Sequence, residues 1–183
     1  MRQSGWISLA LSVVAQGAAA EVEVSLYGGT QGALDSRVTH STLGSVNVGW
    51  DGRSKAMPPY WGLRVTRWSG DWGFGGEFNH AKIYADDPAS YGYDVLEFTD
   101  GLNILTLNAL RRWQTTDLSI TPYVGAGLGI ALPHVEVAPA GQARTFGYQV
   151  TGPAVAVFVG LSYAIDERWS LFGEYKTTWS RNA

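Results

Sequence analysis

Apolar and polar residues alternate along seven stretches of this chain. Residues 72–79 show the pattern most clearly, because Trp72, Phe74 and Phe78 alternate with glycines and Glu77. Successive side chains of a strand point to opposite faces, so each stretch predicts a strand with one apolar and one polar face. The seven predicted strands lie at residues 22–27, 60–68, 72–84, 102–113, 120–132, 146–164 and 169–179.

The connections between these strands have two lengths. Residues 69–71, 114–118 and 166–168 are tight turns, whereas the other connections are long and cover residues 33–58, 85–101 and 133–145. Small membrane barrels combine short periplasmic turns with long outer loops. Aromatic residues lie beside the short turns, as in the girdle at a lipid–water boundary; they are Trp68, Trp72, Trp113, Tyr163 and Trp169.

The pattern therefore predicts an all-β protein, an antiparallel up-and-down transmembrane β-barrel of the eight-stranded type. In such a barrel the apolar faces point to lipid and the polar faces line the lumen. A soluble sandwich is the alternative, and it would bury the apolar faces instead. Outside the N-terminal region no apolar run is long enough for a transmembrane helix.

The polar faces of the predicted strands carry charges of both signs. A lumen of about eight strands has just enough room for side chains, so opposite charges there can pair and form a polar plug. This argues against an open pore. The residues predicted to point inward are Glu23, Arg64, Glu77, Arg112, Glu174 and Lys176.

The N-terminus has the pattern of a secretory signal peptide. Arg2 is followed by an apolar stretch at residues 6–15 and by three small residues at 18–20. The expected domain organisation is a cleaved signal peptide at 1–20 and a barrel domain at 21–183. Export then places the barrel in the outer membrane of a Gram-negative bacterium.

Seven strands leave the expected barrel one strand short. Open sheet edges are costly in hydrocarbon, and bacterial barrels have an even number of strands. One interpretation is that the sequence is C-terminally incomplete and lacks its last strand. The other is that residues 43–51 supply an extra strand, since residues 45–49 alternate, although their place in an outer segment favours a loop.

Charge excludes one class of partner. The net charge is −3 and only 16% of residues are charged. No basic stripe is present to neutralise phosphates, so nucleic-acid binding is not expected.

Several stretches are more specific than barrel patterning. They read GWDGRS at 49–54, MPPYWGLR at 57–64, FNHAKIYA at 78–85, VLEFTDGLN at 95–103, TPYVGAGLG at 121–129 and YQVTGP at 148–153. Together they resemble the outer-membrane lipid A oxidase family of alphaproteobacteria over nearly the whole mature chain. The resemblance implies oxidation of the proximal glucosamine of lipid A to 2-aminogluconate by molecular oxygen. It does not assign catalytic residues.

Candidate site residues come from the position of the polar groups in the chain. The three histidines and many carboxylates fall at the predicted outer end. The candidate catalytic residues are His80, Glu97, Asp100, His134 and Glu136, and the candidate cations for the phosphates of lipid A or lipopolysaccharide are Arg53, Lys55 and Lys82. By strand phase, His80 and Lys82 continue a lipid-facing row. His134 and Glu136 share a face if their strand continues past Pro133.

The cofactor is unknown at this stage. The sequence has no dinucleotide fingerprint, haem motif or cysteine, so an iron–sulfur cluster is not expected. Two histidines and a carboxylate can bind redox iron, and His80 and His134 with Glu97, Asp100 or Glu136 are one such set. Alternatively, the loop histidines are solvated and the acids bridge to lipopolysaccharide through divalent cations.

Two functions remain open. The first is lipid A oxidation by the outer loops, and the second is a non-enzymatic surface barrel with a binding or envelope-structural role.

Overall fold

The strands of the structure form a ring. The computed structural model describes residues 4–17, 20–114 and 119–182, with side chains described from Glu21 onward. Each strand of the ring pairs antiparallel with the next, in the order β1, β2, β6, β7, β8, β9, β12, β13, and β13 pairs again with β1. The strands are β1 (Ser4–Gly17), β2 (Ala20–Gln31), β6 (Trp61–Ser69), β7 (Trp72–Ala85), β8 (Tyr93–Arg112), β9 (Ile120–Ala131), β12 (Gly152–Ala164) and β13 (Trp169–Ser180).

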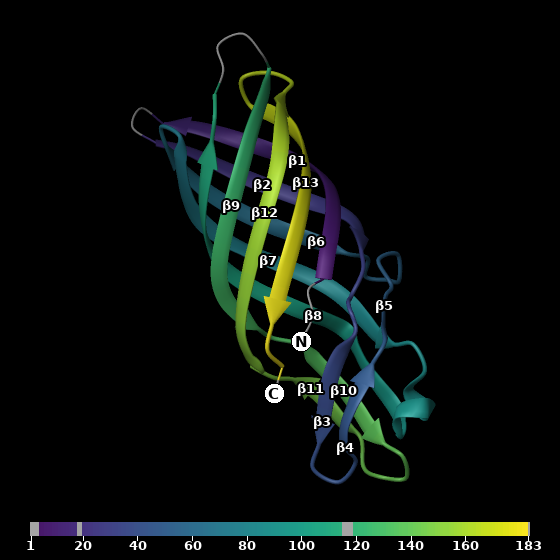
Figure 1. Cartoon of the computed structure of the whole chain (residues 1–183). Helices are drawn as coiled ribbons and strands as arrows, with labels where there is room; N and C mark the ends of the chain where they lie inside the picture. The colour runs from purple at the N-terminus through teal and green to yellow at the C-terminus, as the bar shows by residue number, and fades with distance from the viewer. Residues whose placement is uncertain (1–3, 18–19, 115–118, 183) are drawn as a thin grey trace.

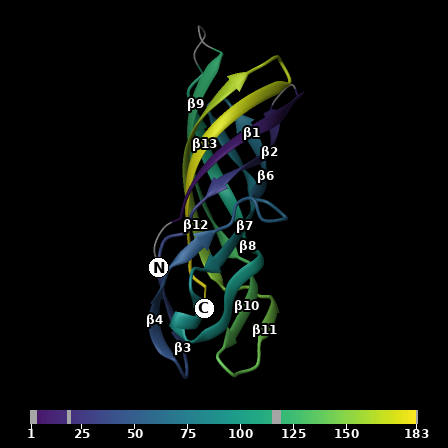
Figure 2. The same ribbon diagram turned by 90° about the vertical axis from the view of Figure 1, so that its right-hand side faces the viewer.

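The long connections fold into short strands at one end of the ring (Figures 1 and 2). Strands β3 (Ser36–His40) and β4 (Gly44–Val48) form a separate two-stranded sheet, and β5 (Trp50–Gly52) pairs with β7. Strand β10 (His134–Pro139) pairs with β8 and with β11 (Thr145–Tyr148). The short helix η1 (Pro88–Tyr91) precedes β8. The expected outer loops are therefore folded hairpins, and residues 44–48 lie outside the ring, as their position in a loop suggested.

The apolar rows face away from the ring. Leu105, Val124, Val157 and Leu171 are 45%, 40%, 52% and 40% exposed, although all four lie within strands of the ring. A water-soluble barrel would bury these side chains, whereas a membrane barrel presents them to acyl chains. The fold is that of a small outer-membrane β-barrel. Within the described residues, no helix is long and apolar enough to cross a membrane.

The predicted strands are confirmed, with changes at their ends. Strand β8 begins nine residues earlier than expected, at Tyr93, because its outer half continues between β7 and β10. The stretch predicted at 146–164 is divided into β11 and β12. Of the expected tight turn at 114–118, residues 115–118 lie outside the described residues.

One member of the expected aromatic girdle points the other way. Trp68 is buried inside the ring, where its indole nitrogen donates to Glu23 at 3.0 Å. The row of Leu63 and Val65 places Arg67 outward and Trp68 inward, so strand alternation explains the difference. Trp72, Trp113, Tyr163 and Trp169 are exposed, as predicted.

Strand β1 occupies the place of the missing eighth strand. It pairs along its length with β13 and β2, and Leu11 lies in register with both Leu171 and Leu26. Its sequence alternates at residues 7–13, so the same segment fits a strand as well as a signal peptide. Removal of residues 1–20 and loss of a C-terminal strand stay predictions. A chain cleaved after Ala20 needs another strand between β2 and β13, because unpaired edges are costly in lipid.

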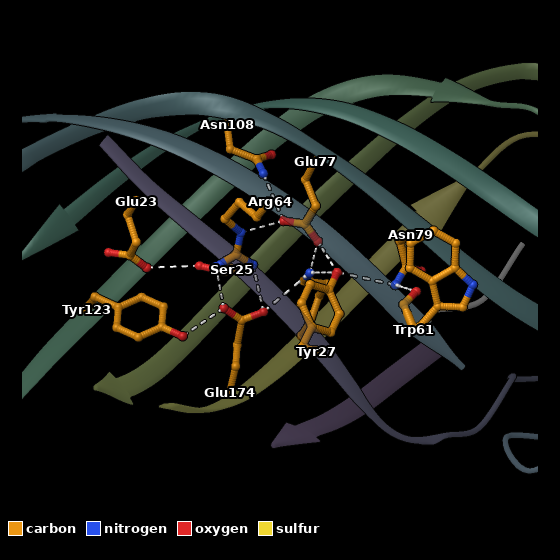
Figure 3. A network of polar contacts seen from close by, with 11 residues as sticks. Glu23, Ser25, Tyr27, Trp61, Arg64, Glu77, Asn79, Asn108, Tyr123 and Glu174 are labelled. Atoms are coloured by element: carbon orange, nitrogen blue, oxygen red, sulfur yellow. Dashed lines mark hydrogen bonds and ion pairs between the residues drawn. The ribbon is translucent and has the colours of Figure 1, made fainter. Parts of the chain in front are cut away.

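The lumen holds a network of paired charges (Figure 3). Arg64 donates to Glu77 at 2.6 Å and, through both terminal nitrogens, to Glu174 at 2.8 Å. Lys176 pairs with the same two carboxylates. Tyr123 also donates to Glu174 at 2.9 Å. The two cations balance the two anions. The expected polar plug is confirmed, and it fills the middle of the lumen.

The outer end of the lumen is closed by apolar packing. Val48 of β4 is fully buried against Ala85, Tyr93 and Leu96. A second cluster below it contains Ile83, Leu102, Ile104, Ala131 and Ala154. The β3–β4 hairpin thus covers the outer mouth, and apolar side chains pack together above the plug.

Candidate functional site

Polar side chains continue the lipid-facing rows beyond the apolar belt. Leu128 and Ile130 of β9 are exposed on the outer wall, and His134 and Glu136 follow at even positions in β10. Val137 packs against the apolar cluster around Val48 inside the outer mouth. The neighbouring even-numbered positions of β10 therefore point to the outer wall. The expected shared face of His134 and Glu136 is confirmed by the pairing of β10 with β8 and β11.

A row of acidic groups crosses four strands on this wall. Asp51 of β5 lies opposite Tyr84 of β7, Tyr84 opposite Glu97 of β8, and Glu97 opposite Glu136 of β10. Side chains that face each other in adjacent strands are about 5 Å apart at Cβ, and like charges placed so are destabilising. The direct pairing of Glu97 with Glu136 is therefore unfavourable unless neighbouring groups offset it.

Two arginines partly balance these acids. Arg144 pairs with Glu136, and Arg53 pairs with Asp51 at 3.3 Å. The Arg53 guanidinium also lies 4.0 Å from the centre of the Tyr84 ring. Burial raises the pKa of the Tyr84 phenol above its ordinary value, and the nearby Glu97 carboxylate raises it further, while Arg53 acts in the opposite direction.

His80 is held in one orientation by its neighbours. Its Nδ1 lies 2.8 Å from the amide oxygen of Asn103, and its ring stacks beside Trp61 with centroids 6.4 Å apart. Because an amide oxygen only accepts hydrogen bonds, this contact puts the proton on Nδ1 and leaves Nε2 as a bare acceptor. The Nε2 atom is buried and has no hydrogen-bond partner.

His134 lies between two aromatic rings. The Phe146 and Tyr148 rings approach it edge-on, with centroids at 4.4 and 4.8 Å. Its Nδ1 is 3.7 Å from the Asp100 carboxylate, beyond hydrogen-bond range, and is buried without a partner. Both histidines thus keep an unsatisfied ring nitrogen, which is uncommon for buried polar atoms.

All five candidate catalytic residues meet in one region, which we call the outer-wall cluster. Sequence reasoning missed Tyr84, Asn103 and Arg144. Tyr84 and Asn103 join the cluster through cross-strand register, which no single stretch of sequence reveals, and Arg144 borders the cluster through its pairing with Glu136. The outer-wall cluster consists of His80, Tyr84, Glu97, Asp100, Asn103, His134 and Glu136.

The three candidate cations have different environments. Arg53 and Lys55 are exposed at the edge of the cluster. Lys82 is buried, and its ammonium group donates to the Met57 carbonyl oxygen. Its expected position at the lipid surface is wrong, because the loop at residues 53–58 covers this part of β7.

The donor groups do not converge as a metal site. Within the described residues, no three His, Cys, Asp or Glu side chains are placed to hold one metal ion. The expected set of two histidines and a carboxylate is therefore not assembled. His80 is instead bound to Asn103, and His134 faces Asp100 alone.

A cavity of about 260 Å³ opens at the opposite end of the ring, beside the short turns. Two of its acidic groups have partners in the lining, since Arg112 binds Glu21 at 2.7 and 3.1 Å and Trp68 donates to Glu23. None of the candidate site residues lines this cavity. The candidate site residues therefore lie away from this cavity, at the other end of the ring.

Comparisons with known proteins show similarity in fold alone. No protein-family model matches the chain, and no curated protein matches it. Among solved structures, it is similar to Neisserial surface protein A (NspA), with 14% identity and a TM-score of 0.41. The likeness covers 96% of this chain and 95% of NspA.

Proposed function

We propose that this protein acts in the outer membrane of a Gram-negative bacterium as a lipid A oxidase, converting the proximal glucosamine to 2-aminogluconate with molecular oxygen. The observation that supports this best is the position of the outer-wall cluster. It lies on the lipid-facing side, one step beyond the apolar belt: Asn103 is two residues past Leu105, or about 7 Å along a strand. Groups at this height lie level with the lipid headgroups. Asp100 is exposed there, whereas His80, Asn103, His134 and Glu136 are covered by neighbouring side chains.

Side chains fill the middle and the outer part of the lumen, and the cavity of about 260 Å³ lies at the opposite end, beside the short turns. The charges of the plug are mutually paired, and the β3–β4 hairpin packs over the outer mouth. A substrate with acyl chains in the outer leaflet reaches the outer-wall cluster without leaving the membrane. Arg53, Lys55 and Arg144 border that cluster and suit a phosphorylated headgroup.

The reaction has a definite balance. The C1–H bond of the hemiacetal breaks, and its electron pair passes to oxygen, which leaves as hydrogen peroxide. Water then opens the resulting lactone to the acid, so lipid A gains one oxygen atom. Within this scheme, His80 Nε2 is suited to accept the C1 hydroxyl proton, because Asn103 keeps its proton on Nδ1.

The test is expression of the chain in a Gram-negative host whose lipid A has a free C1 hydroxyl. Aerated cells are expected to accumulate lipid A heavier by one oxygen atom, and purified protein is expected to release hydrogen peroxide in equal amount. His80→Asn and Glu97→Gln are each expected to lower conversion by roughly a hundredfold or more. His40→Asn is the matched control, because His40 lies in the β3–β4 hairpin outside the cluster.

Folding is checked by the heat-dependent gel migration of the barrel. Unchanged lipid A with correctly folded protein and oxygen present would contradict the proposal. That outcome would favour the non-enzymatic surface barrel. Equal loss of activity in the His40 and His80 variants would contradict the assignment of the site.

A further inference from the structure

The outer face of the β10–β11 hairpin (residues 134–148) carries an exposed apolar row. Phe146 and Tyr148 of β11 are 62% and 65% exposed, and Val150, just after the strand, is 70% exposed. Within the described chain, no element packs over their outer surfaces. Contiguous apolar side chains of this kind mark an interaction surface.

This row is continuous with the lipid-facing belt. Phe146 lies opposite Glu136, and Tyr148 lies opposite His134. His134 and Glu136 continue the outward row of Leu128 and Ile130. The backbone joins the hairpin to the barrel wall, since Gln149 N donates to Pro133 O and Thr151 N donates to Ala131 O. The exposed row is thus the same wall at a greater height.

The residue types in this hairpin are those found at a membrane–water interface, not those typical of a surface in bulk water or in hydrocarbon. Aromatic side chains concentrate at the boundary between acyl chains and headgroups. Arg144 lies 5.0 Å from the Phe146 ring centre and pairs with Glu136. A long cationic side chain can extend its charge to the headgroups while its neighbours stay among acyl chains.

We infer that the β10–β11 hairpin lies in the outer leaflet at the headgroup boundary, with Phe146, Tyr148 and Val150 against lipid. His134 is then shielded from water by rings that lipid covers on their other side. The inference depends on the barrel's orientation in the membrane and not on oxidase activity. It holds or fails whether or not lipid A is oxidised.

Nitroxide depth measurements test this directly, because the chain has no cysteine and each variant therefore carries one label. The variants are Phe146→Cys and Tyr148→Cys, and Thr145→Cys on the same strand is the matched control. Thr145 lies opposite Val137, which packs into the inner cluster. Leu128→Cys gives the reference for lipid, and Arg37→Cys gives the reference for water.

The labelled proteins are folded into phosphatidylcholine vesicles, and collisions with oxygen and with a water-soluble nickel complex are compared. The ratio of oxygen to nickel collisions is expected to fall between the two references at 146 and 148, several-fold above its value at 145. A ratio at 146 and 148 equal to that at 37 would overturn the inference. Equal ratios at 145 and 146 would also overturn it, since no single face would then meet lipid. Heat-dependent gel migration confirms folding for each variant.

Discussion

The lumen plug and the outer-wall cluster both concentrate charge, but they use it differently. In the plug, Arg64 and Lys176 face Glu77 and Glu174, and every ionised group has opposite partners at close range. The only unsatisfied side-chain atom described there is the Asn108 carbonyl oxygen. In the outer-wall cluster, two histidines keep unsatisfied nitrogens and two glutamates face each other.

This difference indicates that the charges of the plug stabilise the fold, whereas the polar groups of the outer wall are candidates for function. A fully paired network fixes a fold, whereas like charges and unsatisfied atoms are an unfavourable arrangement that proteins keep mainly at working sites. Substitutions in the plug are therefore expected to change stability, and substitutions on the outer wall are expected to change chemistry.

The largest expected effect is on stability, from Glu77→Ala. Glu77 accepts from Arg64, Lys176, Tyr27 and Asn108, and its loss leaves a buried positive charge uncompensated. Breaking one partner of a buried ion pair costs roughly 3–5 kcal/mol. Urea unfolding from phospholipid vesicles measures this cost.

Two further glutamate variants are compared with Glu77→Ala. Glu167→Ala, on an exposed turn, is expected to change the free energy of unfolding by less than about 0.5 kcal/mol. Glu97→Gln is expected to lower lipid A oxidation with a much smaller loss of stability than Glu77→Ala. Equal stability losses in Glu77→Ala and Glu97→Gln would remove the distinction between the two regions.

Gly101→Ala is expected to act on the outer wall alone. Gly101 has φ +99°, and a Cβ there would lie 2.4 Å from the His80 ring and 3.0 Å from the Asn103 amide oxygen. We expect His80 to be displaced and lipid A oxidation to fall by roughly a hundredfold. Gly141→Ala is the matched control, because Gly141 has φ +69° with nothing within 4 Å.

Both glycine variants bear a left-handed backbone cost of about 1–2 kcal/mol. Urea unfolding is expected to show that shared cost in each of them. Only Gly101→Ala is expected to lose activity. Full activity in Gly101→Ala would show that the orientation of His80 does not matter.

The smallest expected effect is a pH dependence at the periplasmic end. The backbone N–H groups of Arg168 and Trp169 donate to Asp166 and lower the pKa of its carboxyl below the ordinary value. A lowered pKa adds stability above about pH 4, the unfolded value, and this stability is lost as pH falls through the folded value. Asp166→Asn is expected to remove a small acid-dependent decrease in the thermal midpoint below about pH 4. An unchanged pH profile in Asp166→Asn would contradict the role of this carboxylate.

Strand alternation predicted the barrel because lipid and lumen impose opposite demands on neighbouring residues. The same rule could have placed Trp68 inward, since its strand alternates regularly from Trp61. It could not have predicted the outer half of β8. There the pairing partners shift between Leu102 and Phe98, and Asp100 and Gly101 resemble a turn in sequence.

The sequence predicted only part of the candidate site, because the rest depends on how the strands pair. His80, Glu97 and His134 stood out by residue type and by their place near the outer end. Tyr84 and Asn103 are ordinary strand residues. The regular pairing of β7 with β8 places Asn103 opposite His80, and the shift beyond it brings Tyr84 beside Glu97. A shift in pairing depends on both strands, so neither sequence alone specifies it.

The length of β8 also sets how far the candidate site lies from the apolar band. Twenty residues run from the periplasmic turn to Tyr93, so the strand spans the apolar band and reaches well beyond it. Glu97, Asp100 and Asn103 of the outer-wall cluster lie on this strand, at a fixed distance from Leu105 and Leu107, and β7 and β10 supply the other members. The barrel therefore fixes the distance between the cluster and the apolar band. A thicker bilayer would bring His80 and Glu97 towards hydrocarbon and a thinner one would leave them in water, so the proposed oxidation is expected to depend on bilayer thickness.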